Sequence, residues 1–498
     1  MEINQELGGA QSFSALMCQR ILNSDVSEDF TIPDYCPEIR RVLYLKEELP
    51  APARFVSGSK IDVSGVVDYT LVYVNSEGEV CSAPLSAEYS FALPIENAND
   101  FELGEGVSVM AHTVAENSSV RVSAPRRLQI RSHLRTGVCA FGKMRLFENF
   151  EGLENEDSVE RLLGEAECAD LLCESSEVIT LEDEYLFSKE GCGVALADSS
   201  VALESVRTDG ESVLASGEAV VKMLINCDGK SESVVRRIPF EAEIDVSGVD
   251  MSHDPVARVN GFVTDVALEV EEERINIELS LILEACVAQN RPFSYVRDVY
   301  STEQECECQT KEISLPTLIG VKSFNLTQSE KLERAELNFP EGAQIVHVYA
   351  SACFDGVKDD EGRRMLTGSC KYDLICLVGG EYTHVEARLP FEQAVDIDGA
   401  AALIDGIAHV GSCKARSDGE NIIFESDISV HCVAFGSREV QMPSEIAFMH
   451  RREDERDRWI VYYLCPGDDA WSIAKRYGVR EDKIRGDISS DRFVMIER

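Results

Sequence analysis

Few residues in this sequence have the types and spacing that catalysis requires. Gly229-Lys230-Ser231 is similar to the end of a phosphate-binding loop, but that motif needs a glycine where Leu224 stands. The segment fits the tip of a hairpin better. The eight histidines show no HExxH or other metal-ligand spacing, and no GxSxG or GxGxxG lies between a strand and a helix. We therefore expect no enzyme, no cofactor and no metal site.

Cysteines and acidic runs offer two weaker candidates for chemistry. Cys306-Glu307-Cys308 could bind a metal or act in redox chemistry, but it fits a solvated loop better. The 17 cysteines are scattered and contain no CxxC pair, which favours a reducing compartment. Acidic runs such as Glu271-Glu272-Glu273 and Asp359-Asp360-Glu361 are typical of solvated turns rather than of general-acid pairs or calcium loops.

Length and charge limit the function classes further. The chain has 498 residues, enough for three or four folding units. Its formal net charge of −43 disfavours nucleic acid and anionic membrane surfaces as partners. With 44% hydrophobic residues it should fold, and no apolar run is long enough to cross a membrane. The acidic N-terminus lacks the features of a secretory signal, so we expect a cytoplasmic protein.

A pattern that occurs three times organises the chain. Gly65, Gly217 and Gly368, spaced by 152 and 151 residues, each precede alternating apolar positions and then a turn, which predicts three hairpins. Each return strand ends in an apolar residue and a proline, which marks strand ends or sheet edges. The turns are Glu77-Gly78, Asp228-Gly229 and Gly379-Gly380, and the steps are Leu93-Pro94, Ile238-Pro239 and Leu389-Pro390.

A third landmark repeats at Cys139, Cys286 and Cys432. Each cysteine stands among small apolar residues, so we interpret them as core residues near strand ends rather than as functional thiols. The run from Ile275 to Leu283 alternates with one apolar face. We therefore predict a mainly β protein with three repeated β-sandwich-like modules in series, each with its own core.

The predicted boundaries follow from these patterns. The modules cover residues 1–150, 178–305 and 306–447. Residues 151–177 form an acidic linker in which Val159, Leu162, Leu163 and Ala166 have helical spacing, which predicts a short helix. Residues 448–458 form a charged linker, and 459–498 form a small α+β (βααβ) module. From His450 onward the chain has 11 basic and 11 acidic side chains, so this tail is neutral.

The last 40 residues resemble the LysM module. The motif Gly467-Asp468-Asp469-Ala470-Trp471-Ser472-Ile473-Ala474 carries this resemblance and follows a predicted strand, Trp459–Leu464. A helix is predicted over Ala470–Tyr477, which Asp468 or Asp469 can cap and Gly478 can end. A short helix at 481–484 and a strand at 493–496 complete the module. The resemblance implies a groove that binds N-acetylglucosamine glycans or, redeployed, a protein. Its residues would be Pro466, Gly467, Asp468, Asp469, Ala470, Trp471, Arg485 and Asp487. Trp471 is expected to pack in the core beneath the strands.

The remainder resembles the SPOCS family of spore-coat proteins from endospore-forming Firmicutes. The lead motif Ile32-Pro33-Asp34-Tyr35-Cys36-Pro37-Glu38-Ile39 carries this resemblance, with Pro33, Asp34, Pro37 and Glu38 as its family positions. The arrangement resembles clostridial spore-coat morphogenetic proteins. This implies a non-enzymatic scaffold in the mother-cell cytoplasm, at the forespore outer surface, with other coat proteins as partners and with the LysM module docked to the ATPase of the coat's basement layer. The alternative is a peptidoglycan-binding protein of the cell wall or spore cortex.

Overall fold

The protein is built mainly of antiparallel strands. The computed structural model describes residues 11–96, 101–102, 107–146, 156–187, 192–227, 230–271, 273–361, 363–396, 401–452 and 458–498. Strands make up 80% of the described residues and helices 4%. This confirms the mainly β prediction. In the described ranges, no helix has the length and apolar character that crossing a membrane requires.

Two sheets form the first module. In one sheet, β4 (Lys60–Asn75) is central and pairs with β2 (Ile39–Glu48), β3 (Ala53–Ser57) and β5 (Val80–Pro94). In the other, β8 (Arg127–Leu146) is central and pairs with β1 (Gln11–Thr31), β6 (Phe101–Glu102) and β7 (Ser108–Ala124). Side chains of both sheets meet in one core, which includes Tyr69 and Leu134. The two sheets therefore form a sandwich.

The next two stretches of chain repeat this strand order. In module 2, β10 (Gly193–Asp209), β11 (Ser212–Cys227) and β12 (Lys230–Asp245) face β13 (Val256–Val270), β14 (Arg274–Ser301) and β9 (Val159–Leu186). In module 3, β16 (Gln344–Asp360), β17 (Arg363–Val378) and β18 (Glu381–Val395) face β15 (Gln304–Glu333), β20 (Asn421–Arg451) and β19 (Ala401–Asp418). Each pair of sheets has its own core.

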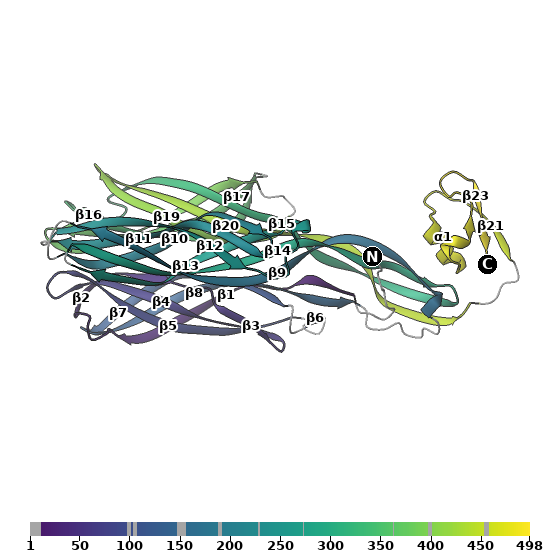
Figure 1. Ribbon diagram of the computed structural model, residues 1–498, viewed down its shortest axis with the longest axis horizontal. Coiled ribbons are helices and arrows are strands. Elements are labelled where there is room, and N and C mark those ends of the chain that lie inside the picture. Colours follow the sequence, from purple (N-terminus) through teal and green to yellow (C-terminus); the bar gives the residue numbers. More distant parts are fainter. Residues whose placement is uncertain are drawn as a thin grey trace.

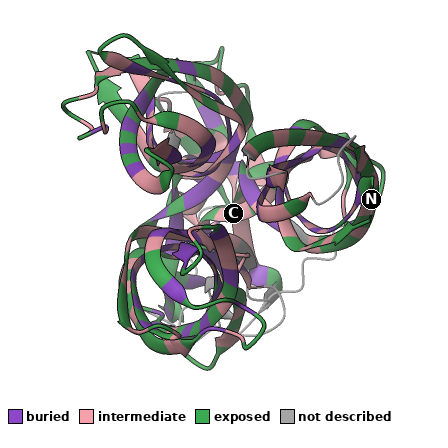
Figure 2. Ribbon diagram, turned by 90° about the vertical axis from the view of Figure 1, so that its left-hand side faces the viewer, coloured by how far each residue is buried: buried purple, intermediate pink, exposed green. Residues whose placement is uncertain are grey.

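The three modules pack side by side around a common centre (Figure 2). Apolar layers along this centre draw residues from all three modules. One layer joins Tyr44, Leu196 and Ile375, and another joins Phe141, Ala288 and Phe435. The repeated cysteines lie in mid-strand beside the second layer, so their predicted place near strand ends is wrong. They are buried or half-buried, as a core role requires. Cys139 and Cys286 pack in a core between modules, whereas Cys432 packs among residues of module 3.

The helix predicted between modules 1 and 2 is a strand. In the described part of this stretch, Glu156–Ser158 forms a 3-10 turn, η2, and β9 begins at Val159. β9 pairs with β14 from Val159↔Ser301 to Leu186↔Arg274, so the ladder outweighs a local helical spacing of four apolar residues. Module 2 therefore includes residues that were assigned to the linker. The charged linker 448–458 is also strand in its first part, since β20 ends at Arg451, whereas residues 453–457 lie outside the described residues.

The hairpins and edge prolines occur where the sequence predicts them. β4 and β5 join through Gly78, with φ 88°, and β17 and β18 join through Gly379 and Gly380, with φ 57° and 88°. The turn between β11 and β12 lies outside the described residues. The prolines of all three pairs belong to the edge strands β5, β12 and β18. Pro94 ends β5, but β12 continues past Pro239 to Asp245 and β18 past Pro390 to Val395, so the prediction that the return strand ends there is wrong for these two strands. An edge strand tolerates an internal proline, because its missing N–H can face away from the ladder.

The repeated glycines leave room for neighbouring groups. The ring of Tyr89 packs over Gly65, and that of Phe391 packs over Gly368. A Cβ at Gly217 would clash with the carbonyl oxygen of Ala202, where the register of β10 shifts. We expect Gly217→Ala to lower the free energy of unfolding by roughly 1–3 kcal/mol through overpacking. Urea denaturation measures this, with Gly193→Ala, which opens onto free space, as the control. Equal effects of both changes would contradict it.

One disulfide was not predicted. Cys192, just before β10, bonds to Cys227 at the end of β11, and the two residues are 35 apart in sequence. The bond ties the first residues of β10 to the hairpin of β11 and β12. Cys306 and Cys308 were predicted in a solvated loop, but they lie half-buried in β15, where Cys306 packs beside Val299.

Long strands carry the chain away from the three-module body. The paired ends of β9 and β14, and of β15 and β20, extend beyond the body to the C-terminal unit, residues 458–498 (Figure 1). Between the two ribbons lie Val299, Ile446 and Phe448, so this stalk has an apolar interior. The stalk therefore holds the C-terminal unit at a distance from the acidic body.

Candidate functional site

The C-terminal unit contains most of the residues that the sequence singles out. It consists of β21 (Trp459–Tyr463), α1 (Ala470–Tyr477), the 3-10 turn η4 (Glu481–Lys483), β22 (Ile484–Arg485) and β23 (Phe493–Glu497). The strand order is β21-β23-β22. Asp469 caps α1 through the Ser472 backbone, and Gly478 ends the helix with φ 64°. The unit therefore contains, in chain order, a strand, a helix, a 3-10 turn and two strands.

The predicted groove residues lie mainly in two turns at one end of this sheet. Pro466, Gly467, Asp468 and Asp469 follow β21, and Asp487 precedes β23. Tyr463 pairs with Phe493, which brings both turns to the same end. Of the remaining residues, Ala470 and Trp471 begin α1, and Arg485 lies in β22.

The acidic side chains of these turns accept hydrogen bonds from neighbouring residues. The carboxylate of Asp468 accepts from the Cys465 backbone at 2.7 Å and from the Tyr462 hydroxyl at 2.9 Å. Hydrogen bonds from Ser489 and Ser490 lower the pKa of Asp487 to about 2, and those from Ser472 lower the pKa of Asp469. The carboxylates of Asp469 and Asp487 are therefore ionised near neutral pH, and all three acidic side chains make hydrogen bonds within their own turns.

Trp471 contacts the stalk rather than lying only beneath the strands of its own unit. It is half-buried, its ring meets that of Tyr300 in β14 at a centroid distance of 4.8 Å, and its Nε1 donates to Asp298 at 2.8 Å. Lys475 Nζ donates to both oxygens of Asp298, at 2.6 and 2.8 Å. The Tyr300 hydroxyl donates to the carbonyl of Val479 at 2.7 Å. The helix side of the unit is therefore fixed on the stalk.

The opposite side of the unit is an exposed apolar sheet face. Alternate residues of β21 and β23 point outward, and their exposed fractions are high for such large side chains. We call them the outer face: Trp459 (45%), Val461 (51%), Tyr463 (64%), Phe493 (46%) and Met495 (38%). Contiguous exposed apolar side chains of this kind mark interaction sites.

The lead motif forms a turn that joins the two sheets of module 1. Pro33 and Glu38 flank a turn in which the Cys36 amide donates to the Pro33 carbonyl at 2.9 Å. Arg126 donates to the carbonyls of Pro33 and Cys36. Asp34, fully exposed, lies 3.6 Å from Arg126, and the Pro37 carbonyl accepts from the buried Tyr73. The motif is therefore a structural closure of the sandwich, with Asp34, Pro37 and Glu38 exposed.

Buried charges join the modules at their common centre. Three equivalent positions of the modules lie there, each paired in its sheet with the residue five positions after a repeated glycine. They are Lys46 of β2, Asp198 of β10 and Tyr349 of β16. Asp198 accepts from His347 Nε2 at 2.7 Å and lies 3.8 Å from Lys46 Nζ. Lys46 also lies 5.4 Å from the centroid of the Tyr349 ring. We call Lys46, Asp198 and His347 the axial triad. It links all three modules.

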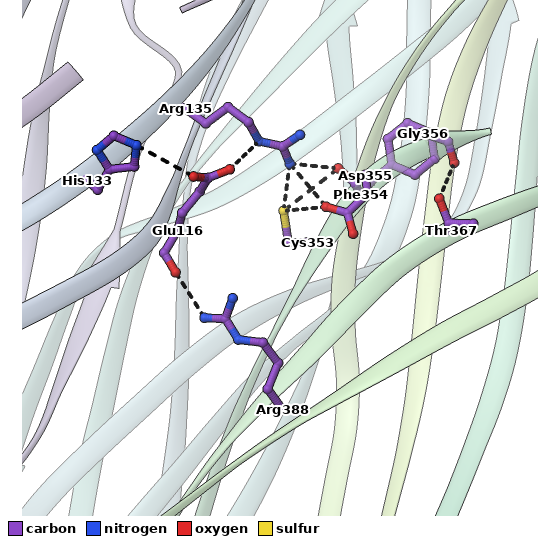
Figure 3. Close-up of polar contacts among 9 residues, drawn as sticks. All are labelled: Glu116, His133, Arg135, Cys353, Phe354, Asp355, Gly356, Thr367 and Arg388. Carbon is purple, nitrogen blue, oxygen red and sulfur yellow. Dashed lines mark hydrogen bonds and ion pairs between the residues drawn. The ribbon is translucent and has the colours of Figure 1, made fainter. Parts of the chain in front are cut away.

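A cavity of about 630 Å³ adjoins the axial triad and is lined by residues of all three modules. Arg135 of β8 lies between two carboxylates, 3.2 Å from Glu116 and 3.3 Å from Asp355 of β16 (Figure 3). Arg388 donates to the Glu116 carbonyl at 2.9 Å. Burial lowers the pKa of His112 to about 4, so it is neutral near pH 7. These contacts cross-link modules 1 and 3, which gives the cavity wall a structural role.

Sequence reasoning missed the axial triad, the stalk contacts of Asp298 and the outer face. The alternation Trp459, Val461, Tyr463 was visible in the sequence and could have indicated an apolar face, but not its exposure. Among the described residues, no three His, Cys, Asp or Glu side chains group as metal ligands. No family model, curated protein or solved structure matches this chain.

Proposed function

We propose that this protein is a non-enzymatic scaffold in spore-coat assembly, which docks through its C-terminal unit to the ATPase of the coat's basement layer. In this proposal, the three modules are copies of one SPOCS-like sandwich and the C-terminal unit is a LysM-like module. The protein acts in the mother-cell cytoplasm at the forespore outer surface. The outer face carries the proposal, because it is an apolar surface of aromatic and methionine side chains that nothing in the described chain covers.

The arrangement of the chain suits a scaffold. The acidic body and the nearly neutral C-terminal unit lie at opposite ends of the stalk (Figure 1). A partner can therefore approach the unit without the full repulsion or attraction of the body's charge. Trp471 and Lys475 fix the unit on the stalk, which presents the outer face in a set direction. A fixed orientation reduces the entropy that docking costs.

The alternative, binding of peptidoglycan glycans in the groove, is favoured less. A sugar ring needs a free aromatic platform, and Trp471 is already engaged by Tyr300 and Asp298. Sedimentation with purified peptidoglycan distinguishes the two functions: the alternative expects co-sedimentation that is lost when residues 459–498 are deleted.

The docking proposal is tested with the full-length chain and the purified ATPase. We expect the double change Tyr463→Asp and Met495→Asp to weaken binding at least about tenfold, since it places charge in an apolar contact. Val178→Asp is the matched control, because Val178 is 61% exposed on module 2. Isothermal titration calorimetry measures both. Unchanged affinity in the double variant, or equal losses in both chains, would refute docking through the outer face.

A further inference from the structure

The free edge of β21 differs from other sheet edges of this chain. Its sequence, Trp459-Ile460-Val461-Tyr462-Tyr463, contains no charge and no proline. The edge strands β5, β12 and β18 all contain proline, which cannot donate to an added strand. Prolines and charges at edges prevent pairing with other chains. In the described structure, β21 lacks both devices.

The register shows which backbone groups face this edge. The Arg498 amide donates to the Arg458 carbonyl, and the Leu464 amide donates to the Arg492 carbonyl, both at 3.1 Å. Bonded and non-bonded pairs alternate in an antiparallel ladder, so Ile460 and Tyr462 bond to β23. The N–H and C=O groups of Trp459, Val461 and Tyr463 therefore point away from β23. Among the described residues, no strand other than β23 pairs with β21.

The same three residues contribute side chains to the outer face, so one extended partner could meet both features. Its alternate side chains would extend the apolar face beyond β21. Arg458, just before β21, and Arg492, just before β23, are exposed. In the described chain their guanidinium groups make no hydrogen bond or ion pair. Two exposed cations at the ends of an uncharged strand favour a partner segment that carries carboxylates at its ends.

We propose that β21 accepts an added strand from the partner protein. The occupant is an extended segment with apolar side chains at alternate positions and acidic residues at its ends, and its backbone bonds to Trp459, Val461 and Tyr463. This mode gives affinity through main-chain hydrogen bonds and selectivity through alternate side chains. The inference rests on the proposed function for the partner's identity, the basement-layer ATPase, and it adds the manner of recognition.

Hydrogen exchange of the full-length chain tests the mode directly. In the free chain, we expect rapid exchange at the amides of Trp459, Val461 and Tyr463 and slow exchange at Ile460 and Tyr462. The purified ATPase should slow the first three. Binding without this alternating protection would overturn strand addition. Protection of the three amides by self-association, without the ATPase, would overturn a heterologous partner.

Two substitutions at Val461 distinguish the contribution of its backbone amide to binding from that of its side chain. Val461→Pro removes a free donor without removing a bond to β23, and Val461→Thr keeps the donor and the branched shape. We expect proline to weaken ATPase binding about tenfold or more and threonine less than threefold. Equal losses would overturn strand addition. Should proline unfold the unit, seen by tryptophan fluorescence, the exchange pattern of the unsubstituted chain decides. Unchanged binding by the Tyr463→Asp, Met495→Asp chain would instead refute the proposed function.

Discussion

Replacing Asp198 with alanine should lower the free energy of unfolding by roughly 3 kcal/mol, because it leaves the buried His347 ring without its hydrogen-bond acceptor. It also removes one of the two carboxylates beside Lys46, the other being that of Glu48 at 2.9 Å. The side chains of Lys46 and His347 are 3% and 0% exposed, so water cannot replace the lost carboxylate. The three modules meet at this point, so we also expect their unfolding to become less cooperative. Urea denaturation followed by circular dichroism measures both effects.

The matched control is Asp209→Ala, since Asp209 lies in the same strand but is exposed. It should change the stability by less than about 0.5 kcal/mol. Asp198→Asn should fall between the two, because an amide keeps the hydrogen bond to His347 but not the charge. Equal stability of the Asp198→Ala and Asp209→Ala chains would show that the axial triad does not hold the modules together.

Asp198 also makes a contribution that depends on pH. Burial raises the pKa of its carboxyl group, but the hydrogen bond from His347 and the charge of Lys46 together outweigh burial, so the pKa is lowered. A carboxyl group with a lower pKa in the folded state stabilises above its unfolded pKa, about 3.9, and loses that contribution as the pH falls through the folded pKa. Unfolding measured between pH 3 and 6 should therefore show a steeper acid loss in the natural chain than in Asp198→Ala.

Replacing Tyr300 with alanine should release the C-terminal unit from the stalk. Tyr300 is fully buried among residues of that unit, and truncation of a buried aromatic ring costs roughly 3–5 kcal/mol. The chain has two tryptophans, Trp459 and Trp471, and both lie in the unit, so tryptophan fluorescence reports on this unit alone. We expect its unfolding transition to move to lower urea than the circular dichroism transition of the body.

Tyr300→Phe is the control for this change. It keeps the ring against Trp471 and removes only the hydrogen bond to the Val479 carbonyl, which should cost about 1 kcal/mol. A fluorescence transition that stays unchanged in Tyr300→Ala would show that the unit folds independently of the stalk and that its orientation is not fixed by Tyr300.

Local patterns predicted the hairpins and the C-terminal elements well, because their signals are short-range. Glycine turns, edge prolines and the Asp469 cap determine the structure of only the few residues around them. The helix predicted at Val159 failed because its competitor, the ladder with β14, lies more than 100 residues away in sequence. For the same reason the sequence could not show that Cys139 packs between modules, or that Trp471 meets Tyr300.

In the candidate site, too, local features were predictable from the sequence and long-range contacts were not. The cap of the helix at Asp469 was predicted, since capping is local, whereas the turn at Asp487 was not. The exposure of Tyr463 depends on which side of a three-stranded sheet the stalk covers, and the burial of Lys46 depends on an aspartate in another module. Both are properties of the assembled chain.

The axial positions have one more consequence. In an assembly of three identical chains, a single codon would supply the same residue three times around the axis, and three lysines or three aspartates would repel one another there. In this chain Lys46, Asp198 and Tyr349 are encoded at three separate positions, so three different residues can meet at the common centre. Joining the modules in one polypeptide thus permits an asymmetric centre, in which each module packs against a defined neighbour.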